Sequence, residues 1–188
     1  MVQLWRMLGD AVLPFLLMIA VAIIFVYFVA RRQNGLSNRM IVNLFLLASM
    51  MGVLMVTVWI GGARGMPSIV NLTPLVGVYH ALFHSGDLTI AMRNLVLNAF
   101  LFIPFGFFLS ARLSQIKSKL WLKITVMGLF FSLIIEGIQF MVPSGRAVDI
   151  DDLLANTVGT YLGYITWAYL KSKFYRNTQA KQISEAKL

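Results

Sequence analysis

The sequence predicts an all-α membrane protein: a helical bundle of about five transmembrane helices, with the N-terminus outside and the C-terminus in the cytoplasm. Of its 188 residues, 59% are hydrophobic and only 12% are charged, about half the charged share of a typical soluble domain. The apolar residues form runs long enough to cross a bilayer, and short basic clusters separate those runs. The net charge of +9 therefore indicates loops beside an anionic membrane face, and we predict no nucleic-acid partner.

Five segments are candidate transmembrane helices, because a bilayer core of about 30 Å requires about 20 apolar residues in a helix. The first lacks the basic start and cleavage site of a signal peptide and is followed at once by Arg31 and Arg32, so we interpret it as a retained helix. The third and fifth are short and interrupted by polar residues, and we expect the others to shield them from lipid. The predicted spans are residues 11–30, 40–60, 95–111, 120–142 and 153–170.

The segment between the second and third spans, residues 61–93, is predicted to hold a further membrane-associated stretch. Its apolar part, residues 66–83, is broken by Pro67, Asn71, Pro74 and Gly77. Proline and glycine interrupt helices, so this stretch is a poor spanning helix. We predict an interfacial or re-entrant segment here.

The positions of lysine and arginine set the predicted orientation, because these residues favour the cytoplasmic face. With the N-terminus outside, twelve of the sixteen fall in cytoplasmic segments and four fall in outer segments. We predict that residues 1–170 form a single membrane domain and that residues 171–188 form a basic cytoplasmic tail, frayed or disordered. Five of the seven acids then lie on the outer side: Asp10, Asp87, Asp149, Asp151 and Asp152.

The fourth predicted helix carries a polar stripe. Ser132, Glu136 and Gln139 follow at i, i+4 and i+7 spacing, which places them on one helix face. A carboxylate is unfavourable in lipid by about 3 kcal/mol or more, so Glu136 should face the bundle or a water-filled cavity. It lies thirteen residues after Lys123, about 20 Å along the helix axis. That distance places it nearer the outer end of the helix.

Polar residues at three helix ends and in one loop are predicted to reach one membrane level. The third helix begins with Arg93 and Asn94, and the acidic loop 146–152 separates the fourth helix from the fifth. Gly159 and Gly163 in the fifth helix have the spacing that lets a neighbouring helix approach closely. The predicted polar cluster comprises Arg93, Asn94, Asn98, Glu136, Gln139, Arg146, Asp149, Asp151, Asp152 and Asn156.

Four motifs lie in order between about residues 71 and 165. They are Asn71-Leu-Thr-Pro74; Arg93-Asn94-xxx-Asn98-xxx-Phe102-Ile-Pro104-Phe-Gly106; Glu136-xx-Gln139; and Arg146-xx-Asp149-x-Asp151-Asp152-Leu-xx-Asn156-xx-Gly159-xxx-Gly163. In order and spacing these motifs resemble the VanZ-like family. The resemblance implies a multi-pass protein of the bacterial plasma membrane, related to one associated with resistance to teicoplanin and similar lipid-anchored glycopeptides. The first helix and the basic tail lie outside the matching motifs.

The acidic residues of the cluster have more than one interpretation. Glu136 and Gln139 are either a buried polar clamp for Asn98 or Asn156, or a substrate-facing acid, base or ligand. In the loop, Asp151 and Asp152 suit the N-terminal dipole of the following helix. Asp149 suits an ion pair with Arg146. The same loop could instead bind a ligand, a lipid head group or, less favoured, a hard divalent cation.

The basic residues and the histidines also have more than one interpretation. Arg93 and Arg146 could hold a phosphate bidentately or act as counter-ions to the acids, and the sequence favours neither. His80 and His84 lie one helical turn apart, but nothing nearby offers a third metal ligand, so packing at the membrane interface is favoured. The chain has no cysteine, which excludes thiolate metal sites and nucleophiles. We predict no metal and no cofactor.

Three functional hypotheses follow. The leading one is an outward-facing polar pocket that engages an envelope amphiphile: a lipid head group, a lipid-linked wall precursor or a lipoglycopeptide antibiotic. The alternative is a membrane-embedded enzyme acting on such a substrate by acid–base or metal-assisted chemistry, with Glu136 and Asp149 as candidate catalytic residues. The third is a transporter or channel subunit, which would require an oligomer. The predicted partners are membrane lipids or a lipid-linked envelope molecule, and an oligomer is compatible with the sequence.

Overall fold

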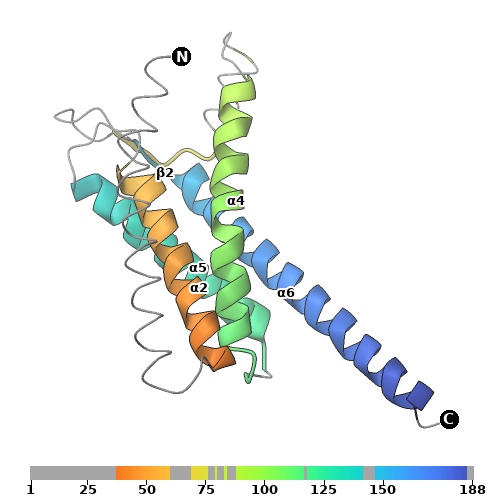
Figure 1. Cartoon of the computed structure of the whole chain (residues 1–188). Coiled ribbons are helices and arrows are strands. Elements are labelled where there is room, and N and C mark those ends of the chain that lie inside the picture. The colour runs from red at the N-terminus through yellow and green to blue at the C-terminus, as the bar shows by residue number, and fades with distance from the viewer. Residues whose placement is uncertain are drawn as a thin grey trace, which may run out of the picture.

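The computed structural model describes residues 37–59, 69–75, 79, 83, 88–116, 118–141 and 147–185. Long helices dominate these residues, and two short strands lie at one end of them (Figure 1). The elements are α2 (Asn38–Leu54), the π-helix η1 (Met55–Trp59), β1 (Ile69–Asn71), α4 (Leu88–Arg112), α5 (Leu120–Met141), β2 (Ala147–Asp149) and α6 (Ile150–Glu185).

Three of the described helices are long and apolar enough to cross a membrane: Asn38–Thr57, Met92–Arg112 and Leu120–Met141. They confirm the predicted spans 40–60, 95–111 and 120–142 as long apolar helices. The first predicted span, 11–30, lies outside the described residues. The fifth, 153–170, is helical but is part of the more polar α6, so the count of five remains a prediction.

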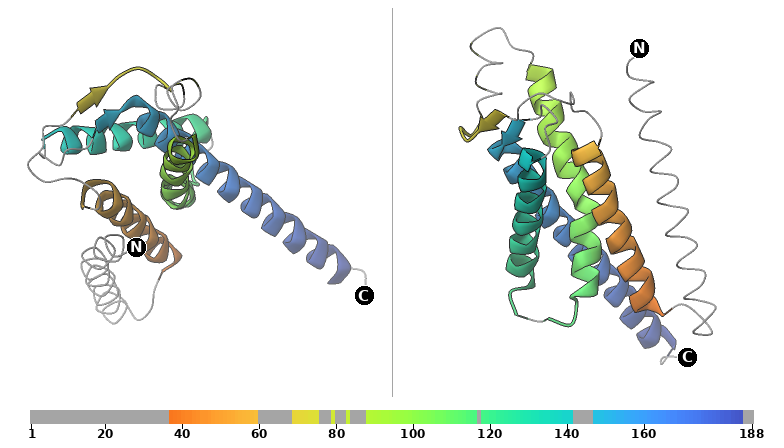
Figure 2. Two further views of the ribbon diagram at one scale, coloured as in Figure 1. Left: turned by 90° about the horizontal axis from the view of Figure 1, so that it is seen from above. Right: turned by 90° about the vertical axis from the view of Figure 1, so that its left-hand side faces the viewer.

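Helix α6 is a single helix of 36 residues. At 1.5 Å per residue it is about 54 Å long, well beyond the roughly 30 Å of a bilayer core. The expectation that the tail after Lys171 is frayed or disordered is wrong for residues 171–185, which are helical. These residues contain no glycine or proline and several good helix formers, so nothing in them ends the helix. Seen from above, α6 leads away from the other helices (Figure 2).

Close backbone contact between α4 and α6 holds the bundle together. A Cβ atom added at Gly159 would overlap the carbonyl group of Ala99, and one at Gly163 would overlap that of Ile103. Gly106 of α4 approaches the backbone of α6 equally closely. The predicted role of the Gly159-xxx-Gly163 spacing is therefore confirmed. The order of these contacts also shows that α4 and α6 run in the same direction.

Aromatic side chains fill the centre of the bundle. Phe102 and Phe105 of α4 pack against Phe131 of α5, with ring centroids 5.8 and 4.8 Å from that ring. Ile124 and Ile135 of α5 are fully buried beside them. By contrast, many large apolar side chains on the outer helix faces are exposed, as expected for surfaces that contact lipid.

The two strands are the one departure from an all-α fold within the described residues. β1 and β2 pair in parallel, with Ile69, Val70 and Asn71 opposite Ala147, Val148 and Asp149. Residues 69–71 thus form a strand and not a helix, and the interfacial or re-entrant placement of the segment 66–83 stays a prediction. β-Branched residues in both strands favour extended backbone, and Pro74 restricts helix formation just after β1.

Candidate functional site

Asp149 is the centre of a hydrogen-bond network at the start of α6. Its backbone N–H donates to Oε2 of Glu136 (3.2 Å), which ties the loop to α5. Its Oδ1 accepts from the backbone N–H of Asp151 (2.9 Å), the arrangement of a helix N-cap. Its Oδ2 accepts from Nδ2 of Asn71 (3.2 Å), across the strand pair. One residue thus joins α5, β1 and α6.

The turn after β1 is fixed to the same network. Oδ1 of Asn71 accepts from the backbone N–H of Thr73 (3.3 Å), which closes an Asx turn. The backbone N–H of Leu75 donates to Oδ1 of Asp151 (2.7 Å). Leu75 has a φ of 57°, a left-handed conformation that is strained for a leucine. The carboxylate of Asp151, only 7% exposed, offsets that strain with a short charge-assisted bond.

The polar stripe of α5 is buried, as predicted. Glu136 is 6% exposed and Gln139 is 5% exposed. Nε2 of Gln139 donates to the carbonyl of Thr57 in η1 (2.8 Å), where the carbonyls of a helix end lack intrahelical donors. Gln139 therefore acts as a clamp between α5 and η1. Oε2 of Glu136 accepts a hydrogen bond from the backbone N–H of Asp149.

Asn156 lies deeper, between α5 and α6. It is 1% exposed, and its Nδ2 donates to Oγ of Ser132 (2.8 Å), a fully buried hydroxyl. Its carbonyl accepts from Oγ1 of Thr160 (3.0 Å). Within the described part of the chain, no donor reaches Oδ1 of Asn156. The residue is thus an interhelical contact one turn inside the bundle.

The predicted site residues of α4 lie at the level of the Asp149 network. Within the described residues, no hydrogen bond joins them to it. Arg93 and Asn94 are exposed and Asn98 is half-buried. Because Ala99 lies against Gly159 and the two helices run in the same direction, Arg93 is level with the first turn of α6. Several predicted residues lie outside the described residues: Arg146, Asp10, Asp87, His80 and His84.

Asp152 lies in the first turn of α6 beside Asp151, as the helix-dipole interpretation predicted. The predicted set omitted Asn71 and Thr57. A sequence feature did point to Asn71, since Asn71-Leu-Thr-Pro74 is one of the motifs of the family resemblance. No such feature pointed to Thr57, because it takes part through its backbone carbonyl.

The family model VanZ/LLP1 matches residues 12–171. The chain belongs to the VanZ/LLP1 family. The match confirms the resemblance and extends beyond the motif region to include the first predicted span. No curated protein and no solved structure matches the chain.

The chemistry of this VanZ/LLP1 network is that of clustered carboxylates beside exposed apolar side chains. Glu136, Asp149 and Asp151 all accept backbone hydrogen bonds, and a carboxylate oxygen can accept more than one. The network can therefore also accept bonds from hydroxyl, amide or ammonium groups. No group of three acidic or histidine side chains among the described residues is arranged to hold a metal ion.

Proposed function

We propose that the network around Asp149 forms an outward-facing site that engages an amphiphile of the bacterial envelope. The amphiphile is a lipid head group, a lipid-linked wall precursor or a lipoglycopeptide antibiotic. In the last case the site would contribute to teicoplanin resistance. The observation that carries the proposal is the convergence of three carboxylates and Asn71 on one helix end.

The surroundings of the network also suit a molecule with a polar head and an apolar tail. Three exposed apolar side chains lie among the polar residues of β1 and the turn that follows it: Val70, Leu72 and Leu75. Leu72 is 70% exposed. An amphiphile could place hydrogen-bond donors on the carboxylates and apolar groups on these side chains. The basic residues at the far end of the helices support an outward orientation.

The test compares isosteric variants that remove charge and keep shape. Asp149→Asn retains a good N-cap, and Glu136→Gln retains an oxygen that can accept from the Asp149 N–H. Purified protein in nanodiscs would be titrated with a fluorescent lipid-linked wall precursor and with teicoplanin. We expect both variants to weaken binding at least tenfold for the true ligand, because a charge-assisted bond contributes about 1.5–3 kcal/mol.

The matched control is Glu185→Gln, the same type of change at the opposite end of α6. Its affinity should equal that of the wild type. Unchanged affinity for every envelope amphiphile in Asp149→Asn and Glu136→Gln, with wild-type thermal stability, would contradict the proposal.

A membrane-embedded enzyme is the second candidate function. It is favoured by the placement of Glu136 and Asp149 within one hydrogen-bonded unit, which could support acid–base chemistry. Incubation of the protein with radiolabelled envelope lipids, with and without Mg²⁺, tests it. Product that disappears in Glu136→Gln would support an enzyme, and absence of any product under both conditions would count against one.

A further inference from the structure

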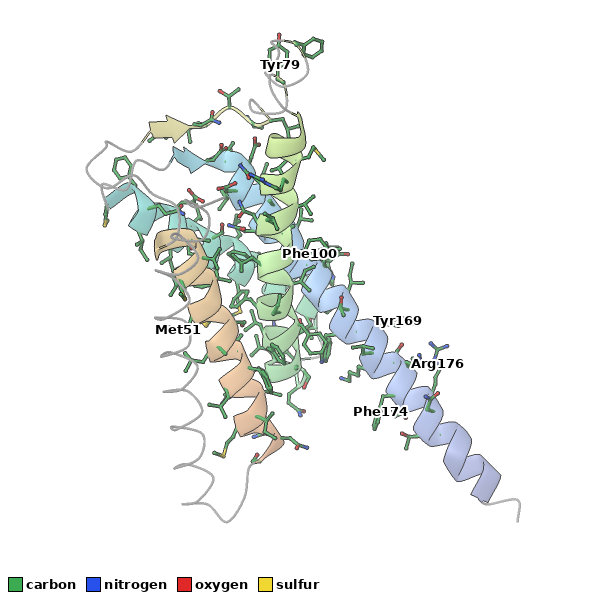
Figure 3. All side chains as sticks on the ribbon, turned by 45° about the horizontal axis from the view of Figure 1, so that its top comes forward. Met51, Tyr79, Phe100, Tyr169, Phe174 and Arg176 are labelled. Atoms are coloured by element: carbon green, nitrogen blue, oxygen red, sulfur yellow. The ribbon has the colours of Figure 1, made fainter. Side chains whose placement is uncertain are left out.

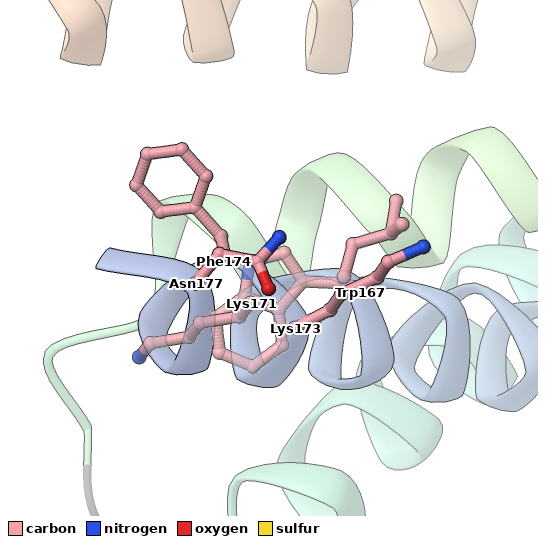
Figure 4. A pocket seen from close by; sticks show the side chains of 6 residues that line it. Trp167, Lys171, Lys173, Phe174 and Asn177 are labelled. Carbon is pink, nitrogen blue, oxygen red and sulfur yellow. The ribbon is translucent and has the colours of Figure 1, made fainter. Parts of the chain in front are cut away.

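Where α6 leaves the bundle, beginning at Trp167, which still packs against the core, one face of the helix is an apolar strip flanked by lysines. Trp167, Leu170 and Phe174 lie within a narrow arc of the helix, since successive residues are 100° apart. Lys171 lies on one side of this apolar strip and Lys173 on the other. Together with Asn177 these side chains, all from α6, line a shallow, open hollow of about 460 Å³ (Figure 4).

The side chains of this face are arranged for a membrane surface. Nζ of Lys171 lies 4.8 Å from the ring centroid of Trp167, so the lysine lies along the apolar strip. Phe174 is 76% exposed. Phe174 and Arg176 project from opposite sides of the helix (Figure 3). A phenylalanine this exposed between two lysines is typical of helices whose apolar face enters the head-group region.

Charge and geometry favour a lipid over other occupants. Residues 171–185 carry four basic residues and one acid, which gives a net charge of +3. A second copy of the chain on this face would bring like charges together. Helix α6 runs obliquely to α2 and α4 (Figure 1). In a bilayer spanned by those two helices, its final turns would therefore lie closer to the membrane surface than those of a helix parallel to them.

We propose that this hollow binds one anionic phospholipid of the adjacent leaflet. Lys171 and Lys173, one on each side of the apolar strip, attract the phosphate group, and Trp167, Leu170 and Phe174 cover the glycerol and the upper acyl chain. The site lies at the opposite end of α6 from the Asp149 network and does not rest on the function proposed for that network.

The experiment is native mass spectrometry of the full-length protein released from nanodiscs of phosphatidylcholine containing a minority of phosphatidylglycerol. The measured quantity is the ratio of protein carrying one phosphatidylglycerol to protein carrying none. The test variants are Lys171→Gln/Lys173→Gln and Phe174→Ala. The control is Arg112→Gln/Lys123→Gln, which removes two exposed charges from α4 and α5. All altered side chains are exposed, and circular dichroism verifies that each variant folds.

The expected result is a fall of about fivefold per lysine in Lys171→Gln/Lys173→Gln, with a clear fall in Phe174→Ala and little change in the control. Phosphatidylcholine retention should not respond to the lysine changes. Equal loss in the two double variants would indicate general surface charge and overturn the proposal. Unchanged retention in Phe174→Ala, or loss of a dimer in place of loss of lipid, would overturn it as well.

Discussion

At the scale of single residues, Asp149 is the residue that joins three elements of the described structure by hydrogen bonds. Its backbone N–H and both carboxylate oxygens are engaged, with partners in three different elements. Each bond alone would contribute about 1 kcal/mol. Because the three share one residue, a substitution there removes contacts to α5, β1 and α6 together.

Two substitutions at this position separate the capping role from the charge. We expect Asp149→Ala to lower the free energy of unfolding by about 1–2 kcal/mol, since it removes an N-cap. Asp149→Asn should cost clearly less, because asparagine also caps helices. Unfolding in mixed detergent, followed by circular dichroism, measures both. Equal destabilisation by the two variants would show that capping is not what Asp149 contributes to stability.

At the scale of elements, the contact between α4 and α6 depends on glycine. A methyl group at Gly159 has no room, whereas Gly137 of α5 has nothing within 4 Å of the position where a Cβ would lie. The two glycines therefore form a natural pair for comparison in the same bundle.

We expect Gly159→Ala to lower stability by about 1–3 kcal/mol, because the helices must move apart. Gly137→Ala should instead raise it by about 0.5–1 kcal/mol, because alanine reduces the conformational freedom of the unfolded chain in an unhindered helix. Thermal denaturation of the two purified variants decides this. Tolerance of alanine at Gly159 would mean that α4 and α6 are not in the described contact.

The sequence predicted these helices because long apolar runs and a small-residue spacing are local signals. The strand pair had no such signal. Its strands have three residues each, and the bond between Asn71 and Asp149 joins positions 78 residues apart. The start of the last helix was also missed. The sequence predicts Asp151 and Asp152 before a helix that starts at residue 153, whereas α6 begins at Ile150, capped by Asp149.

In the candidate site, too, local features could be predicted from the sequence and long-range contacts could not. The burial of Glu136 and Gln139 follows from their spacing on an apolar helix. The partners of these residues depend on elements brought together by folding, so sequence alone left them open. The carbonyl of Thr57, which Gln139 contacts, could not be predicted because any residue can supply a backbone carbonyl.

At the scale of the whole molecule, the carboxylate side chains and the basic side chains gather at opposite ends of the bundle. The carboxylate network lies where α6 begins, and the basic and aromatic face lies where α6 leaves the bundle. Lipid-exposed apolar side chains separate the two. For a VanZ/LLP1 membrane protein we therefore expect the proposed amphiphile site and the proposed phospholipid site to lie on opposite faces of the bilayer.

The most direct test of the central claim is the side of the membrane that the Asp149 network faces. The chain has no native cysteine, so single-cysteine variants can be labelled without background. Leu72→Cys lies beside the network and Ser118→Cys lies between α4 and α5, and both positions are exposed. We predict that a membrane-impermeant maleimide labels Leu72→Cys in intact cells and labels Ser118→Cys only after permeabilisation. The reverse pattern would contradict the account.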